Sequence, residues 1–437
     1  MRIVLFGECP WVPSSAGKIT YLIARGFIEL GHDVLVLCAG VGRPFTRTVC
    51  FNPSRWYSGR VVQYPDVDIY VTLYRHTHLK RVIDEFFGSS GFDGFLAYGT
   101  SFGTPMAEVN DEVCKLGINA VAYTTNDITY LSPSPSASVL AYSVVVGPTT
   151  HSLYDYVRSL RVYYENVDEV LDRFSVVYHG IDLDLYNPKT CEDVCKDFSF
   201  SKDFIVVGML AKNHIRKDYF TLAKVVARLL KEGYNVAYGF FAVRGVSAPV
   251  WDLNNINELV DLLEGVSLLD LRRVITLDIF DDVEGCPEDG VLKIYCCLTD
   301  VHVFLTRGES FGIPPIESLA LHKPTISTAI PPQEEVFGDT IPLVKAELDL
   351  QQHAGLYRVD VDDAYLKTKT VLDGLWDFSK AYEHVRKYDY ISMARGLLDA
   401  IRKSFNHEPL YKVLKKRDKV LTKGLPGIPN ISTAVVK

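Results

Sequence analysis

The sequence predicts an α/β protein with two Rossmann-like domains that face each other across a cleft, and three observations support this prediction. Its 437 residues are too many for one ordinary hydrophobic core. Apolar runs of strand length alternate with longer helical patterns in both halves, which is typical of a parallel sheet covered on both faces. A polar, charge-rich stretch over residues 188–203 interrupts this alternation and is the expected linker.

The first half opens with a βαβ unit. A strand over 3–6 leads through a loop to a helix over 19–30, which ends at Gly31, and the next strand covers 33–38. The same alternation predicts strands at 67–73, 94–98, 120–124, 143–146 and 174–178, and helices at 81–87, 105–116 and 150–160.

The second half restarts the pattern with a very apolar strand over 204–210 and a helix over 219–232. Further strands are expected at 235–242, 274–277, 301–305 and 325–328. The expected units are therefore two domains, a long helical pattern and a basic, flexible tail, over residues 1–190, 200–380, 381–405 and 406–437. Because ligands bind at the carboxyl ends of strands in such sheets, the cleft between the domains is the expected site.

Composition excludes several classes of protein. With 48% hydrophobic and 23% charged residues the chain is globular, and its net charge of −8 argues against a broad nucleic-acid-binding face. The first residues lack a signal-peptide pattern, and no apolar run reaches the roughly 18 residues of a transmembrane helix. We therefore expect a soluble, cytoplasmic protein. The basic tail suits peripheral contact with anionic lipid head groups, although a solvated tail fits it as well.

Nine cysteines are scattered along the chain without the spacing of a zinc site. Cys191 and Cys195 can meet on one helix face, but we expect them to remain thiols because the odd total argues against a full disulfide framework. His76 and His78 would share one side of a strand, with no acid or cysteine near them in the sequence. The sequence therefore predicts neither a metal site nor a cofactor.

The most informative motif places two carboxylates, Glu309 and Glu317, on either side of a glycine-bearing loop. An apolar stretch, expected to be a buried strand, precedes the loop, and a Pro-Pro pair with a helical pattern follows it. Backbone N–H groups of such a loop, with the positive end of the helix, favour an anionic ligand. Two carboxylates beside an anion are expected to bind neutral hydroxyls, such as those of a sugar and a ribose. The motif therefore points to a nucleotide sugar as co-substrate.

Three cations lie in the loop after the first strand of the second half, namely Lys212, Arg216 and Lys217. Guanidinium and ammonium groups pair well with phosphate oxygens, so this loop suits a diphosphate. A solvated charged loop is the alternative reading. We favour the diphosphate because this loop is expected at the same sheet edge as Glu309.

Two weaker motifs lie in the first half. The segment from Pro13 to Lys18 fails the phosphate-loop pattern, since Val12 stands in place of its first glycine. It remains a small-residue loop that lets a substrate approach a helix start, or else a plain tight turn. His179-Gly180 closes the first half, and its glycine indicates a sharp turn at the expected cleft wall.

Together these motifs resemble glycosyltransferase family 4, the retaining enzymes of the GT-B fold. The resemblance covers about residues 3–340 and rests most specifically on Glu309-x7-Glu317, supported by Ser15-Ala16-Gly17, Gly31-His32-Asp33-Val34, His179-Gly180-Ile181-Asp182 and residues 212–217. It implies metal-independent transfer of a hexose from a nucleotide-diphosphate sugar to an acceptor hydroxyl, on a lipid-linked glycan, a polysaccharide or another glycoconjugate. It also implies that the helix over 381–405 crosses back to the first domain.

The resemblance assigns roles to residues. Glu309 corresponds to the acid that holds the sugar hydroxyls and Glu317 to the acid that holds the ribose, while Arg216 and Lys217 neutralise the leaving diphosphate. The other donor residues that it implies are Gly208, Lys212, Ser310, Phe311, Gly312 and Ile313, and the acceptor or cleft residues are Ser15, Ala16, Gly17, Lys18, Thr125, Asn126, His179 and Gly180.

The chain departs from the family in three places. The glycine pair of the first loop is Ala16-Gly17 here. Met209 stands where an arginine often follows the glycine of the first strand, with Lys212 as a substitute. Residues 122–127 contain no histidine, although many members have one there near the reacting carbon. The alternatives are a catalytically inactive or regulatory binder of sugar nucleotides, a GT-B epimerase, and a phosphorylase, for which we identify no cofactor lysine.

Overall fold

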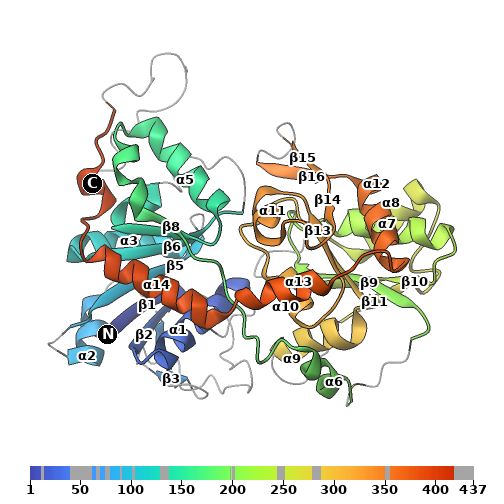
Figure 1. Ribbon diagram of the computed structural model, residues 1–437, viewed down its shortest axis with the longest axis horizontal. Coiled ribbons are helices and arrows are strands. Elements are labelled where there is room, and N and C mark those ends of the chain that lie inside the picture. The colour runs from blue at the N-terminus through green and yellow to red at the C-terminus, as the bar shows by residue number, and fades with distance from the viewer. Residues whose placement is uncertain are drawn as a thin grey trace.

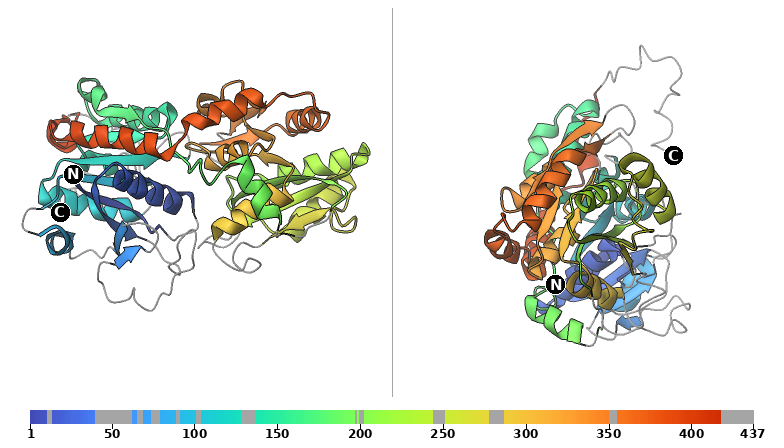
Figure 2. Two further views of the ribbon diagram at one scale, coloured as in Figure 1. Left: turned by 60° about the horizontal axis from the view of Figure 1, so that its bottom comes forward. Right: turned by 90° about the vertical axis from the view of Figure 1, so that its right-hand side faces the viewer.

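The computed structural model describes residues 1–10, 14–39, 62–64, 69–73, 79–88, 91–100, 104–127, 137–196, 198, 202–243, 251–277, 287–349 and 355–417. They form two domains, each with a mainly parallel sheet and helices packed on it (Figure 1; Figure 2). The predicted fold class is therefore confirmed.

The sheet of the first domain has the strand order β3-β4-β2-β1-β5-β6-β7-β8, parallel throughout except between β3 and β4. Because helices cover the sheet, residues 3–6 of β1 and all of β6 are buried and apolar or hydroxyl-bearing. The strands are β1 Arg2–Glu8, β2 Asp33–Ala39, β3 Val62–Tyr64, β4 Ile69–Leu73, β5 Gly94–Thr100, β6 Ala120–Thr125, β7 Val144–Gly147 and β8 Phe174–Val176, with helices α1 Ser15–Glu29, α2 Leu79–Phe87, α3 Thr104–Leu116, η3 Ser138–Ala141, α5 Thr150–Tyr163 and η4 Val167–Arg173.

The sheet of the second domain is fully parallel, in the order β11-β10-β9-β12-β13-β14. Its strands are β9 Ile205–Lys212, β10 Val236–Val243, β11 Val274–Thr276, β12 Val301–Phe304, β13 Thr325–Thr328 and β14 Leu343–Val344. Helices α7 Tyr219–Lys231, α8 Leu253–Glu264, α9 Pro287–Lys293, the π-turn η5 Ile294–Leu298, α10 Ile313–Ala320, α11 Pro331–Phe337 and α12 Val361–Leu372 accompany it, and β15 Ala346–Asp349 pairs with β16 Leu356–Val359 as an antiparallel hairpin.

The first helix begins earlier than the apolar spacing predicts. It starts at Ser15 because the Ser14 side chain caps it, accepting a hydrogen bond from Gly17 N at 2.9 Å. The small residues 15–17 therefore form its first turn rather than a loop. The remaining predicted strands and helices occur where expected, with ends that differ by a few residues, and the part of the 67–73 strand before Ile69 lies outside the described residues.

The C-terminal helix crosses back to the first domain, as the resemblance implies, but it is interrupted. The expected single helix consists of α13 Ser379–His384, the turn η6 Val385–Lys387 and α14 Tyr390–Ser404. Asp389 starts α14 by accepting hydrogen bonds from the N–H groups of residues 391 and 392. Helix α14 packs against α1 and strands β5 to β7, so α13 and α14 span both domains (Figure 1).

Disulfides correct the expectation of free thiols. Residues 188–196 of the expected linker form helix α6 Pro188–Lys196, which is bonded to η5 by Cys191–Cys296 and Cys195–Cys297, and Cys9–Cys38 joins the ends of β1 and β2. Sequence spacing gave no sign of these bonds because the partners of Cys191 and Cys195 lie about a hundred residues away. Such bonds are rare in the cytosol of mesophiles. They therefore do not support the expected cytoplasmic location.

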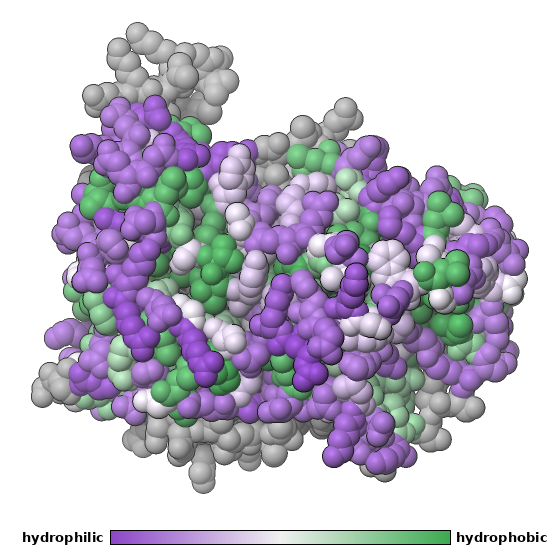
Figure 3. Space-filling view, in the orientation of Figure 1, coloured by the Kyte–Doolittle hydropathy of each residue, from purple (hydrophilic) through white to green (hydrophobic). Residues whose placement is uncertain are grey.

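The described part of the basic tail is also more ordered than expected. Residues 410–413 form helix α15 Leu410–Val413, and the side chains of Leu410 and Leu414 are buried against the region of α5 and η4. On the face drawn in Figure 3, hydrophilic residues predominate and hydrophobic residues form separate groups. None of the helices in the described ranges combines the length and apolar composition that crossing a bilayer requires.

Candidate functional site

The loop between β12 and α10 carries both predicted acids, and a glycine shapes it. Gly312 has a φ of +92° where the chain turns into α10, and a Cβ there would lie 2.5 Å from Gln333 Nε2. That amide donates to the carbonyl of Phe311 at 2.6 Å, and its oxygen accepts from Ser327 at 2.7 Å. The turn therefore requires glycine at 312, and it directs α10 so that Glu317 faces the first domain.

Glu309 meets both predicted phosphate-binding cations. Strands β9 and β12 are neighbours, so the loops that follow them meet at one sheet edge. The Glu309 carboxylate forms an ion pair with Lys217 and lies 4.0 Å from Arg216 Nη1, which also donates to the carbonyl of Gly308 at 2.7 Å. Burial by itself raises the pKa of Glu309, but Lys217 and Arg216 outweigh burial and hold that pKa below its ordinary value. Glu309 is therefore ionised at neutral pH.

Glu317 pairs with a residue of the other domain. Its carboxylate forms an ion pair with Lys18, on the first turn of α1, and Tyr295 Oη lies 3.4 Å from its second oxygen. The Lys18 ammonium also lies 2.6 Å from Tyr186 Oη. Glu317 is only 3% exposed, so this pair is a buried contact between the domains.

The carboxyl ends of two first-domain strands contribute polar groups to the same junction. Thr125 ends β6, and Asn126 donates to the buried Asp155 at 3.1 Å. Asp127 forms an ion pair with Arg216 Nη2 at 2.8 Å, which the sequence did not lead us to expect. At the end of β1, Glu8 accepts a hydrogen bond from Ser14, directly before the first turn of α1 with Ser15, Ala16 and Gly17.

His179 and Gly180 lie where the two domains meet, but Gly180 does not form the sharp turn that the sequence indicated. His179 Nδ1 lies 2.6 Å from Tyr123 Oη, and its ring packs edge-on against Phe311 at 5.2 Å between centroids. Burial lowers the pKa of His179 to about 3, so it is neutral at physiological pH. A Cβ at Gly180 would lie 2.5 Å from the backbone N of Tyr390. Glycine therefore lets the segment around residue 180 touch the start of α14, and these are the two stretches of chain that connect the domains.

The other predicted donor residues differ in their surroundings. Gly208 lies inside β9, within the predicted strand, and a Cβ there would meet the Phe241 ring at 2.9 Å, which gives a packing reason for this glycine. Lys212 is exposed at the end of β9. The side chains of Phe311 and Ile313 belong to the hydrophobic core, and the Ser310 carbonyl accepts from Thr149 of the first domain at 3.0 Å.

Sequence reasoning missed two residues at this junction, Asp127, which contacts Arg216, and Tyr295, which contacts Glu317. The polar run after the apolar part of β6 could have marked Asp127 as a residue at a strand's carboxyl end. Tyr295 had no sequence signal, because its contact with Glu317 depends on the π-turn that carries it. Within the described residues no three metal-binding side chains gather, and His76 and His78 lie outside those residues.

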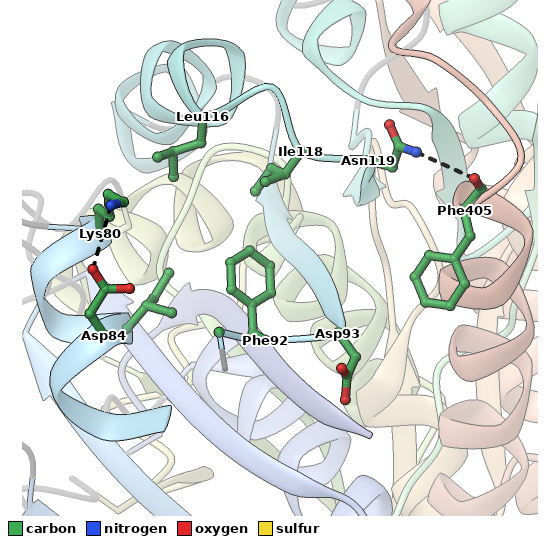
Figure 4. Close-up of a pocket in the computed structure, with 10 residues that line it drawn as sticks. Lys80, Asp84, Phe92, Asp93, Leu116, Ile118, Asn119 and Phe405 are labelled. Atoms are coloured by element: carbon green, nitrogen blue, oxygen red, sulfur yellow. Dashed lines mark hydrogen bonds and ion pairs between the residues drawn. The ribbon is translucent and has the colours of Figure 1, made fainter. Parts of the chain in front are cut away.

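A separate pocket lies at the opposite end of the first sheet, as Figure 4 shows. Its volume is about 440 Å³, and its lining includes Asp93 before β5, Asn119 before β6 and Phe405 after α14. These positions are at the amino ends of the strands. The pocket therefore has no part in the junction of Glu309, Glu317 and Asp127.

Comparisons with known proteins support the fold. A glycosyltransferase from Rickettsia africae has a TM-score of 0.61 at 15% identity, with 92% of this chain and 98% of that chain covered. The Anabaena protein HepE in complex with UDP-glucose has a TM-score of 0.64 at 14% identity (92% and 100% covered), and sucrose-phosphate synthase from Thermosynechococcus elongatus 0.62 at 12% (93% and 99%). No family model and no curated protein matches the sequence. The chain is thus similar in fold to GT-B glycosyltransferases over nearly its whole length.

Proposed function

We propose that this protein is a retaining glycosyltransferase, similar to family 4, that moves a hexose from a nucleotide-diphosphate sugar to an acceptor hydroxyl without a metal ion. The meeting of Glu309, Arg216 and Lys217 at the edge of the second sheet carries the proposal. A buried carboxylate suits neutral sugar hydroxyls, and two cations beside it suit the charge of a departing diphosphate.

In the proposed reaction the bond between the sugar C1 and the diphosphate oxygen breaks, and the diphosphate keeps the electron pair. Arg216 and Lys217 stabilise this charge, and they do so more strongly in a site that excludes water. Lys217 is only 5% exposed, which favours such exclusion. Glu309 orients the sugar and Glu317 the ribose, so neither acid acts as a conventional general base.

The first experiment is release of UDP from UDP-glucose by the purified protein, chosen because HepE was solved with UDP-glucose. A thermal-shift panel of other nucleotide sugars extends it to other bases and sugars. We expect Lys217→Met to lower turnover about 10²- to 10³-fold. The matched control is Lys202→Met, because Lys202 pairs with Asp300 at the amino end of β12 in the same domain. Release of no nucleotide from any donor would instead indicate an inactive binder of sugar nucleotides.

Two further measurements test the remaining roles. Glu317→Ala should weaken donor binding by about 1.5 to 3 kcal/mol, the usual contribution of a hydrogen bond to a charged group. Unchanged donor affinity would contradict the ribose assignment. Turnover should survive EDTA, because cations of the chain take the place of a metal, and a loss that magnesium restores would disprove metal independence.

We propose a glycan or lipid-linked acceptor, with peripheral contact between the basic tail and anionic lipid. Lys412, Lys415 and Lys416 are exposed in the described part of the tail, which supports this contact. Co-sedimentation with phosphatidylserine vesicles tests it. Equal binding to neutral phosphatidylcholine vesicles, or no binding to either kind of vesicle, would instead indicate a solvated tail without specific contact to anionic lipid.

A further inference from the structure

Asp127 is the first-domain carboxylate that reaches the candidate diphosphate site. Only Asn126 separates it from the end of β6, and its carboxylate lies 2.8 Å from Arg216 Nη2, while Arg216 Nη1 lies 4.0 Å from Glu309. One guanidinium therefore stands between an acid of each domain. The backbones also touch here, because a Cβ at Gly308 would collide with the carbonyl oxygen of Asp127.

This position is where an acceptor must arrive. In a retaining transfer the acceptor hydroxyl approaches the face of the sugar that the diphosphate leaves. Under the proposed function Arg216 binds that diphosphate, so a first-domain group bonded to Arg216 lies beside the incoming hydroxyl. The second acid at this edge, Glu8, is the last residue of β1, and β1 and β6 flank β5 in the sheet. Burial, together with the carboxylates of Glu8, Asp127 and Glu309, raises the pKa of Tyr98 on β5.

The charges at this edge select among acceptors. We consider the described residues at the carboxyl ends of β1, β5 and β6 and on the first turn of α1. Lys18 is the one positively charged side chain among them, and it is bound by Glu317 and Tyr186. Carboxylates accept hydrogen bonds from hydroxyls and repel phosphate groups. The sugar phosphate in the name of sucrose-phosphate synthase, a neighbour in fold, therefore does not fit these charges.

We propose that Asp127 binds the acceptor hydroxyl and that the acceptor is a polyhydroxyl compound without a phosphate group near this hydroxyl. This inference rests on the proposed function. Asp127 orients the acceptor oxygen toward C1. As the new C1–O bond forms and the bond to the diphosphate breaks, the hydroxyl proton passes to the departing diphosphate oxygen.

The test compares wild-type protein, Asp127→Asn and the control Asp93→Asn, whose carboxylate pairs with Arg2 at the opposite end of the sheet. The donor is UDP-glucose, or whichever nucleotide sugar the wild type hydrolyses. Hydrolysis without acceptor is measured first, followed by transfer to maltose, octyl glucoside, glycerol, glucose 6-phosphate and fructose 6-phosphate. We expect transfer to neutral compounds only. Asp127→Asn should raise the acceptor KM about tenfold or more and should lower transfer more than it lowers hydrolysis.

Three results would overturn the inference while leaving the transferase intact. These are a preference for the hexose phosphates, an unchanged acceptor KM in Asp127→Asn, and a failure of every neutral compound to be glycosylated despite hydrolysis. An equal fall of hydrolysis and transfer would show that Asp127 only holds the domains together. The absence of nucleotide release from any donor would overturn the proposed function, and this inference with it.

Discussion

Replacing Lys18 by methionine tests the buried ion pair that joins the two domains. The Lys18 and Glu317 side chains are only 10% and 4% exposed, and they come from α1 and α10 of different domains. Methionine keeps most of the lysine stem but removes the charge. Breaking a buried ion pair by removing one partner costs about 3 to 5 kcal/mol, because the remaining charge stays desolvated without its counter-ion.

This cost corresponds to a measurable shift in melting temperature. The entropy of unfolding is about 2.1 cal/mol/K per residue, or about 0.9 kcal/mol/K for the whole chain unfolding as one unit. A loss of 3 to 5 kcal/mol should therefore lower Tm by about 3 to 5 °C. Scanning calorimetry at neutral pH measures it. The control is Lys196→Met, whose pair with Asp193 is exposed and should contribute less than about 1 kcal/mol.

A second substitution separates loss of the charge pair from loss of packing. Lys18→Met combined with Glu317→Leu removes both charges, and a buried ion pair replaced by apolar residues is often neutral or stabilising. The double variant should therefore regain most of the lost stability. A single variant within about 1 °C of wild type, or a double variant no more stable than the single one, would refute the reasoning.

Three further predictions concern stability. Gly180→Ala should lower Tm more than Gly396→Ala. The Cβ at position 180 would meet the backbone of Tyr390 at 2.5 Å, whereas a Cβ at position 396 would meet only the Val177 side chain at 3.0 Å. Equal shifts in Tm would disprove this prediction. Burial lowers the pKa of His179 and of His302 to about 3, so the unfolded chain binds more protons between pH 6.5 and 3. Stability should fall as pH decreases through this range, by about 2 kcal/mol per histidine at pH 5, and urea unfolding of His302→Leu should show a smaller pH dependence than wild type. Replacing all four cysteines of the α6–η5 bridges by serine should lower the free energy of unfolding by about 4 to 5 kcal/mol. Replacing only the Cys195–Cys297 pair should lower it much less, because Cys191–Cys296 already closes the long loop. Equal losses in urea unfolding would contradict this prediction.

The fold could be predicted because alternation of apolar strands with amphipathic helices is a local property. The candidate second-domain site could be predicted for a related reason. Glu309 and the pair Arg216-Lys217 follow two predicted strands, and the carboxyl ends of parallel strands share one edge of the sheet. The roles that we propose for these residues, and those of the first-domain loop, stay predictions.

Other features could not be read from local patterns. The disulfides of α6 depend on where η5 packs, and the break in the expected 381–404 helix comes from the cap at Asp389. Gly208 was placed in the donor site by the family resemblance alone, and its contact with Phe241 on β10 gives a packing reason for a glycine at this position. Each of these depends on contacts between residues that are distant in the sequence or on local capping that periodicity does not report.

The sequence by itself determined two α/β domains, the sheet edge at which the loops after β9 and β12 gather, and the acids and cations on those loops. Tertiary structure decided what lies opposite them. Lys18 against Glu317 and Asp127 against Arg216 join residues of different domains, 299 positions apart in the first case. Such pairs form because the crossing segments at Gly180 and Tyr390 set how the two sheets face each other, and no periodicity within either domain encodes that arrangement.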